Sequence, residues 1–419
     1  MTAALVAGIL SYRCCPAGEI SLLFFGLGAA AMGGHWATRR LPVATRWSWR
    51  WLFGMGAACL LIALGRTVCE LEYNYIQNVC SSQNGQSVLG DWVGQLREGL
   101  GTQIGRYTSG ETQALLRALL LGDKSGLSVV QRDCFRQAGC AHILAVSGLH
   151  VGIVYGALRA VCRRPCRALG PRLAQVAVQL AGLWAYATIC GLPPSVVRSA
   201  LMFSVIAVGY CFEQRPDTCN SVFFSAFLLL LYRPSYLYDI GFQLSYTAVI
   251  GILAFAGEFQ RLVEPLTWLG RQLLSLEAVS LAAQMATAPL CLYYFHSFPI
   301  YFPISNLLAV PAATAFVYLG IGLLAGGLWP VVGQTLGWLL DQGYQVFFGL
   351  LSDISHLPYA TLKISGFGMV EACWLALLLV SAHCCLFRPH KQRWLCLHLG
   401  TLCVALTTGL ARDLVLLLA

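Results

Sequence analysis

Apolar segments separated by short polar stretches follow one another along almost the whole chain. These segments lie near residues 3–11, 20–34, 51–66, 142–159, 174–191, 196–212, 218–232, 238–256, 273–295, 303–327, 331–350, 366–387 and 394–417. A helix that crosses a bilayer needs about 20 predominantly apolar residues, and some of these segments are shorter. The pattern predicts an all-α fold, a polytopic helical integral membrane protein with about 11–13 transmembrane segments plus amphipathic interfacial helices.

The composition agrees with a membrane protein, since 58% of the residues are hydrophobic and only 11% are charged. A soluble domain carries roughly 25% charged residues. A transmembrane β-barrel would show short segments of alternating polarity, which this sequence lacks. The first apolar segment has no basic start and no clear cleavage site, so we expect a short membrane helix there rather than a signal peptide.

Basic residues place three loops on the cytoplasmic side, because cytoplasmic loops are enriched in Arg and Lys. These loops contain Arg39, Arg40, Arg46 and Arg50, then Arg159, Arg163, Arg164, Arg167 and Arg172, and finally Arg388, Lys391 and Arg393. All three loops fit one alternating topology, in which the N-terminus is cytoplasmic, the C-terminus is periplasmic and residues 67–141 lie outside. This topology also accounts for the formal net charge of +9.

The outside stretch contains two predicted helices of its own. Residues 111–121 form an apolar-rich helix that ends at Gly122, and Ser128 begins a second helix that ends at Gly139. One face of the second helix is formed by Val130, Cys134, Phe135 and Ala138. A helix of this kind lies on the bilayer surface, and it leads the chain toward His142.

Three polar residues and a glycine interrupt the next apolar segment within the stretch HILAVSGLHVG, namely His142, Ser147, His150 and Gly148. Polar groups at membrane depth are costly unless they are satisfied, so they mark structural or functional contacts. Ser147 and His150 are three residues apart and could share a hydrogen bond on one helix face. Gly148 lets another helix or a ligand come close. Alternatively, each polar side chain bonds to a neighbouring helix.

Ser147 could also be the nucleophile of an intramembrane serine hydrolase. Rhomboid-type proteases use a serine before a glycine and a histidine on a membrane helix. Their signature has Gly two residues before the serine, where this sequence has Ala145, and the histidine comes from a different helix. His296 and His356 are candidates, but neither lies in a supporting motif. A small-solute transporter is a further alternative, because helices broken by Pro suit transporters.

Three other stretches put polar residues at membrane depth. In GLPPSVVRSALMFSV, Arg198 either has a function or reaches back to the interface. In RPSYLYDIGFQLSYTAVIGIL, Asp239 and Gln243 share a helix face, and Asp239 either pairs with Arg198 or caps its helix. In AAQMATAPLCLYYFHSFPIYFPISNLLAVP, Gln284 and Asn306 flank aromatic residues that form an interfacial belt or a surface on which bases stack.

Cysteine is frequent, with 18 residues, and those in apolar segments act as small hydrophobic residues. The sequence has neither paired CxxC motifs nor a Cys/His or HExxH metal spacing, so no metal site and no cofactor are expected. Cys69 and Cys80 flank part of the outside stretch. If that part faces an oxidising periplasm, these two residues could form a disulfide.

Several stretches, taken in order, resemble the ComEC competence family: ALLLGDKSGLS, RDCFRQAGCAHILAVSGLHVG, the Pro-rich turn before Arg198, DIGFQLSYTAVIGIL, and AAQMATAPL with the later SN. The resemblance covers about residues 111–311. It implies a channel in the bacterial inner membrane, not an enzyme, that passes single-stranded DNA into the cytoplasm during natural transformation. The residues that match family motifs, and that we expect along the DNA path, are His142, Ser147, Gly148, His150, Arg198, Asp239, Gln243, Gln284 and Asn306.

The chain departs from the family in two regions. Larger members carry an OB-type domain at the place that residues 67–110 occupy in this chain. These residues are too few to form such a domain. We therefore expect N-terminal transmembrane helices at 1–66, a short periplasmic region at 67–110 and the channel domain at 111–419. No metallo-β-lactamase-like domain follows, so we expect no nuclease activity from this chain.

The partners implied are single-stranded DNA and the lipid bilayer. A periplasmic DNA receptor or nuclease and a cytoplasmic ATPase would have to be separate proteins, because the sequence has no P-loop motif.

Overall fold

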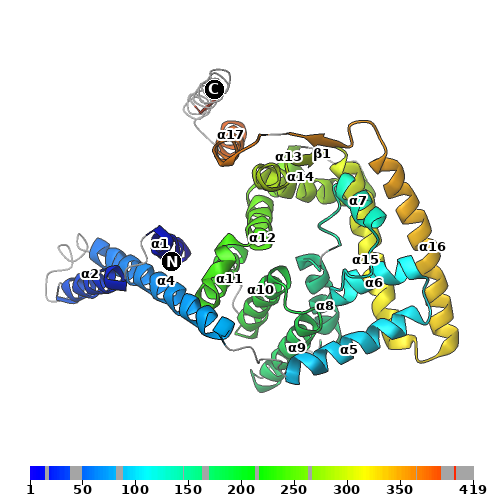
Figure 1. The fold of residues 1–419 in the computed structure, drawn as a ribbon, viewed down its shortest axis with the longest axis horizontal. Coiled ribbons are helices and arrows are strands. Elements are labelled where there is room, and N and C mark those ends of the chain that lie inside the picture. The colour runs from blue at the N-terminus through cyan, green and yellow to red at the C-terminus, as the bar shows by residue number, and fades with distance from the viewer. Residues whose placement is uncertain are drawn as a thin grey trace. The chain divides into compact units, whose positions relative to one another are not determined.

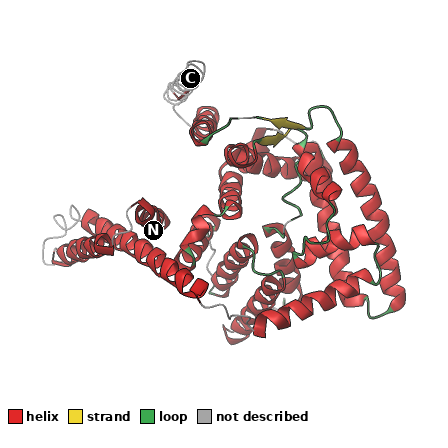
Figure 2. Ribbon diagram, viewed as in Figure 1, coloured by secondary structure: helices red, strands yellow, loops and turns green. Residues whose placement is uncertain are grey.

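The computed structural model describes residues 1–14, 18–37, 50–81, 88–144, 146–162, 169–212, 217–262, 267–364, 366–387 and 401–402. Almost all of the apolar segment expected at 394–417 lies outside these ranges, as do most of the basic residues that define the predicted topology. Helices make up nearly all of the described chain (Figure 2), which confirms the all-α fold class.

The helices are labelled in chain order in Figure 1. They are α1 (Thr2–Cys14), α2 (Gly18–Ala37), α4 (Arg50–Ser81), α5 (Val88–Gly105), α6 (Gly110–Leu121), α7 (Val129–Gln137), α8 (Gly148–Val161), α9 (Leu169–Ile189), α10 (Pro194–Cys211), α11 (Thr218–Tyr232), α12 (Ile240–Gly251), α13 (Gly257–Leu262), α14 (Trp268–Phe295), α15 (Phe302–Gly326), α16 (Pro330–Ser355) and α17 (Met369–Phe387). A short 3-10 helix (Pro234–Tyr238) precedes α12, and a π-helical turn (Ile252–Ala256) joins α12 to α13. Within the described residues the strands are β1 (Ser297–Pro299) and β2 (Thr361–Lys363), which pair antiparallel.

Six helical stretches in the described part of the chain are long and apolar enough to cross a membrane. They are Phe53–Ile76, Pro194–Cys211, Ile240–Arg261, Trp268–Phe295, Phe302–Gly326 and Met369–Phe387. Shorter apolar helices are Thr2–Cys14, Ile20–Met32, Gly148–Val161 and Thr218–Tyr232. The chain is therefore a polytopic helical membrane protein, and the total of about 11–13 segments stays a prediction.

The chain divides into two compact units. Unit 1 comprises Met1–Trp92, Arg164–Leu180 and Val197–Gln243, and unit 2 comprises Val93–Arg163, Ala181–Val196 and Leu244–Ala419. In unit 1, α4 packs against both α1 and α2. A Cβ added at Gly65 of α4 would lie 2.5 Å from the carbonyl oxygen of Leu5 in α1, so the two backbones touch at this point.

Helix α4 extends further than the sequence indicated. The polar stretch expected from residue 67 begins inside α4, which continues to Ser81. Arg66 does not end the helix, because its fully buried guanidinium donates from Nε to the Ser21 hydroxyl (3.2 Å) and from a terminal nitrogen to the Ser11 hydroxyl (3.1 Å). Beyond Arg66, the Glu72 carboxylate of α4 accepts from the backbone N–H (2.9 Å) and the hydroxyl (2.6 Å) of Ser235.

In unit 2, α15 and α16 run beside each other, and α6 and α7 pack onto them (Figure 1). Phe347 of α16 meets Phe135 of α7 and Phe316 of α15, with ring centroids 5.8 Å apart in both pairs. The two helices predicted in the outside stretch are confirmed. Helix α6 ends at Gly122, and Ser128 caps α7 in a capping box with Gln131.

The buried face of α7 differs from the predicted one at its first turn. Val130 is 71% exposed, and Gln131 is buried in its place. Gln131 tolerates burial because its side-chain amide donates to the Tyr344 hydroxyl (2.6 Å) and to the Glu111 carbonyl (3.3 Å). Cys134, Phe135 and Ala138 are buried as predicted. The placement of α7 on the bilayer surface stays a prediction.

Candidate functional site

Three segments of unit 2 meet at one place, and we call them the three loops of the loop cluster: residues 122–126 after α6, 146–150 at the start of α8, and 190–195 from the end of α9 into the start of α10. Gly122 has a φ of +70°, and a Cβ there would lie 2.9 Å from the carbonyl oxygen of Cys190. The Cys190 thiol donates to the Leu120 carbonyl (3.6 Å), and the Ser195 hydroxyl donates to the Val146 carbonyl (3.0 Å). Hydrogen bonds from side chains to backbone carbonyls thus join segments that are far apart in the sequence.

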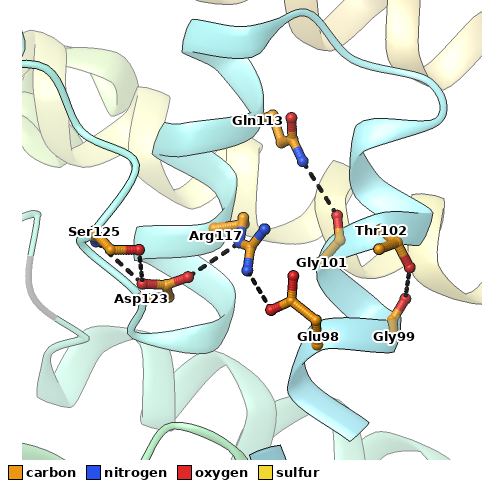
Figure 3. A network of polar contacts seen from close by, with 8 residues as sticks. All are labelled: Glu98, Gly99, Gly101, Thr102, Gln113, Arg117, Asp123 and Ser125. Atoms are coloured by element: carbon orange, nitrogen blue, oxygen red, sulfur yellow. Dashed lines mark hydrogen bonds and ion pairs between the residues drawn. The ribbon is translucent and has the colours of Figure 1, made fainter. Parts of the chain in front are cut away.

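Asp123 organises the first loop (Figure 3). One carboxylate oxygen accepts from the backbone N–H (3.0 Å) and the hydroxyl (2.6 Å) of Ser125. The other accepts from Nε of Arg117 in α6 (3.1 Å). A terminal nitrogen of Arg117 also donates to Glu98 of α5 (2.9 Å), so this arginine bridges two carboxylates. The turn is a short Asp loop that ties α5, α6 and the first loop together.

These contacts favour the charged form of Asp123. The hydrogen bond from the Ser125 hydroxyl is the largest cause that lowers the pKa of Asp123, and it outweighs the opposing effect of burial. The backbone N–H of Ser125 and the positive charges of Arg117 and Arg97 lower this pKa further. Asp123 therefore remains ionised over the physiological pH range and holds the loop in place.

The second loop is closed by Ser147 and His150. Ser147 is the N-cap of α8, which begins at Gly148 rather than near residue 142 as expected. The Ser147 backbone N–H donates to Nδ1 of His150 (3.1 Å), and the Ser147 hydroxyl lies 2.9 Å from the same nitrogen. The hydrogen bond predicted between the two side chains is therefore present, but it forms a helix cap and not a contact in mid-helix.

The geometry of this cap fixes the form of the imidazole. Because Nδ1 of His150 accepts a backbone N–H, the proton of the neutral ring resides on Nε2. His150 is 1% exposed, and Nε2 has no hydrogen-bond partner among the residues that the structure describes. A buried donor is thus left available within the loop cluster.

The third loop has an unusual backbone. Gly191 has a φ of +82°, and Leu192 follows with a φ of +52°. A left-handed conformation costs a residue with a side chain about 1–2 kcal/mol, and such strain gathers at functional sites. Pro194 then begins α10, because proline suits the first turn of a helix.

The remaining predicted residues of unit 2 lie on several elements. His142 is exposed in a turn before the second loop. Asn306 of α15 is 5% exposed, and its side-chain oxygen accepts from the Cys140 thiol (3.6 Å). Gln284 is half-buried on α14. Gly148 is the first residue of α8, where it follows the Ser147 cap directly.

Arg198, Asp239 and Gln243 belong to unit 1. Arg198 is 5% exposed on α10. The Asp239 carboxylate accepts from the backbone N–H of Phe242 (2.8 Å), so it caps α12, and the Gln243 side chain donates to the Leu237 carbonyl (2.8 Å). Of the two roles weighed for Asp239, capping is therefore present, and its pairing with Arg198 stays a prediction.

The structure does not fit the disulfide considered for Cys69 and Cys80. Both residues lie on the continuous helix α4, and Cys69 is a free thiol. Eleven residues of α-helix separate two Cα atoms by about 16 Å, whereas a disulfide needs less than about 7 Å. The expectation failed because the stretch was taken for a polar loop, in which the two residues could approach each other.

Sequence reasoning missed Arg97, Glu98, Arg117 and Asp123 as members of the site. The signal for the turn was present, because Asp followed two residues later by Ser is a typical Asp-turn sequence. Arg117, a charged residue inside the apolar run ALLRALLLGD, was a second signal. Nothing in the sequence connected these residues to the loop at 190–195.

Comparisons with known proteins agree with the resemblance. The chain matches the Competence protein family over residues 119–389. It is 30% identical over 260 residues to ComE operon protein 3 of Bacillus subtilis (strain 168), covering 61% of this chain and 32% of the relative. It is 28% identical over 204 residues to Competence protein ComA of Neisseria gonorrhoeae, covering 47% of this chain and 28% of that relative.

A third relative is an uncharacterized protein of Aquifex aeolicus (strain VF5), which is 30% identical over 216 residues, covering 51% of this chain and 47% of the relative. The matches thus span less than half the length of each of these relatives. No solved structure matches the chain significantly.

The helices define a polytopic membrane protein, and hydrogen bonds join the segments of its loop cluster at helix ends. The whole loop cluster lies within the matched residues 119–389. The chain belongs to the Competence protein family, that is, the ComEC family.

Proposed function

We propose that this protein is an inner-membrane channel that passes single-stranded DNA into the cytoplasm during natural transformation. The family match over residues 119–389, which contain the whole loop cluster, is the observation that carries the proposal. Two relatives bear the names Competence protein ComA and ComE operon protein 3. A path for DNA of any sequence needs cationic groups for phosphates and surfaces on which bases stack.

The motif residues then have structural and path-lining roles. Ser147, Gly148 and His150 shape the start of α8, where the buried His150 supports the loop cluster. His142, Arg198, Asp239, Gln243, Gln284 and Asn306 are the further residues that we propose for the path or for its support. The N-terminus is cytoplasmic and the C-terminus periplasmic in this proposal. We propose single-stranded DNA, the lipid bilayer, a periplasmic DNA receptor or nuclease and a cytoplasmic ATPase as its partners.

The geometry favours this reading over a serine hydrolase. The Ser147 hydroxyl lies 2.9 Å from Nδ1 of His150, a distance that would suit a nucleophile and its base. However, the same nitrogen accepts the backbone N–H of Ser147, so its lone pair is already engaged. A catalytic histidine is also oriented by a third group on its other nitrogen. Among the described residues, Nε2 of His150 has no such partner.

A deletion strain tests the proposal directly. Loss of the gene is expected to abolish transformation by added DNA, while labelled DNA still accumulates at the cell surface. Complementation with the wild-type gene restores transformation, and Ser147→Ala retains most of it, because no bond is broken by Ser147. Unchanged transformation in the deletion strain would refute the channel. Abolished transformation with a well-folded Ser147→Ala protein would instead favour the hydrolase.

A further inference from the structure

Arg97 of α5 lies at the third loop of the cluster. A terminal nitrogen of its guanidinium is 3.7 Å from the position that a Cβ on Gly191 would take. Its charge also acts on Asp123 in the first loop. Arg97 therefore reaches two of the three loops from a helix that precedes both in the sequence.

The positive charge of Arg97 has no ion-pair partner within the part of the chain that the structure describes. Its Nε is buried and makes no hydrogen bond to any described residue. The nearby carboxylate of Asp123 makes its direct contacts with other residues, since it accepts two hydrogen bonds from Ser125 and one from Arg117. Arg117, by contrast, contacts both Glu98 and Asp123. Of these two arginines, Arg117 is the one that forms direct ion pairs within the described residues.

The turn beside Arg97 presents a glycine backbone to the guanidinium. Gly191 has no side chain, and Arg97 is the one group that a Cβ there would meet within 4 Å among the described residues. Leu192 holds a left-handed conformation next to it. A partly buried guanidinium next to a strained, glycine-containing turn matches the form of sites that hold phosphate oxygens, since the planar fork can donate two parallel hydrogen bonds.

We propose that Arg97 binds a phosphodiester group of single-stranded DNA at the loop cluster. This inference rests on the proposed function, which supplies the polyanion. Arg97 contributes one phosphate contact without base selectivity, because phosphate contacts carry no sequence information. A lipid headgroup carries the same phosphate chemistry, and the experiment below separates the two sources.

The test measures binding of a fluorescent single-stranded oligonucleotide to the purified full chain in nanodiscs of zwitterionic lipid, as a function of salt. For single strands, the logarithm of the affinity falls by about 0.7 per phosphate contact for each tenfold rise in salt. Arg97→Gln is therefore expected to bind more weakly and to lose about fivefold less affinity than the wild type over a tenfold salt range. Arg97→Lys keeps the wild-type salt dependence because it keeps the charge.

Arg136→Gln is the matched control, because Arg136 is an exposed arginine of unit 2 that pairs with Asp133 (3.3 Å). It is expected to leave the salt dependence unchanged.

An unchanged salt dependence in Arg97→Gln would overturn the inference. A misfolded Arg97→Gln protein would also overturn it, since Arg97 would then have a structural role. Stabilisation of the wild type by anionic lipid that is absent in Arg97→Gln, with equal oligonucleotide binding, would also overturn it and would assign a lipid headgroup. If the wild type itself binds no oligonucleotide and deletion leaves transformation intact, the proposed function fails instead.

Discussion

Replacing Asp123 by Asn measures what the ionised loop contributes to unit 2. The side chains of Arg117 and Asp123 are 20% and 18% exposed, so this ion pair lies between a surface pair and a buried one. An exposed pair contributes about 0–1 kcal/mol, and removing one partner of a fully buried pair costs about 3–5 kcal/mol. Asn keeps an oxygen for Ser125 but removes the charge. We expect Asp123→Asn to lower the free energy of unfolding by about 2 kcal/mol.

Unfolding in mixed micelles with increasing denaturing detergent, followed by tryptophan fluorescence, measures this loss. Asp133→Asn is the control, because Asp133 pairs with Arg136 where both side chains are largely exposed, at 47% and 71%. The control is expected to lose less than about 1 kcal/mol. Equal stability of Asp123→Asn and the wild type would refute the structural role of the pair.

The pH dependence gives an independent check on the same carboxylate. Its folded pKa is lowered, so the stabilisation is complete above the unfolded pKa, which is about 3.9 for Asp. The stabilisation is then lost as the pH falls through the still lower folded pKa. The wild type is therefore expected to lose its advantage over Asp123→Asn only below about pH 4. If the two proteins differ in free energy of unfolding by the same amount above and below about pH 4, the ionised state of Asp123 is contradicted.

Three further predictions concern helix ends and helix contacts. Ser147→Ala is expected to lower the free energy of unfolding by about 1 kcal/mol through loss of the cap. A fluorophosphonate probe is expected to label neither this variant nor the wild type. Labelling of the wild type alone would restore the hydrolase hypothesis. Gly65→Leu is expected to destabilise by about 1–3 kcal/mol because it forces α4 away from α1, whereas Gly54→Leu, with open space around its Cβ, changes stability by less than about 0.5 kcal/mol; similar losses in both would argue against the close backbone approach. Cys69 and Cys80 are both expected to react with a maleimide in unfolded, unreduced protein, as read by mass, and protection of the pair would contradict their separation along α4.

Local patterns predicted local structure well in this chain. Gly122 and Ser128 bound their helices as expected, because capping depends on a few neighbouring residues. The contact between Ser147 and His150 was also predictable from their spacing, although its place in the helix was not. A serine that can cap a helix and a serine inside a helix look alike in an apolar segment. Only the contacts before the cap, such as that between Ser195 and the Val146 carbonyl, distinguish the two.

Two kinds of feature could not be read from the sequence. Hydropathy indicated the end of a membrane helix at residue 66, but hydrogen bonds from Arg66 to Ser11 and Ser21 let α4 continue. The loop cluster depends on the approach of Gly122 to Cys190, which no periodicity encodes. Arg97 was overlooked for a related reason. It lies in the stretch 67–110, which was considered only as a shortened domain.

The length of helix α4 fixes the position of a second element. Its 32 residues give a rod of about 48 Å, whereas the hydrocarbon layer is about 30 Å thick. If α4 stands upright, roughly a third of its length must project into the headgroups or the water. Glu72 lies toward the C-terminal end of α4 and accepts two hydrogen bonds from Ser235. The turn at Pro234–Tyr238 is thereby held at a set height relative to α4, so a change in the length of that one helix would shift the entry of α12 as well.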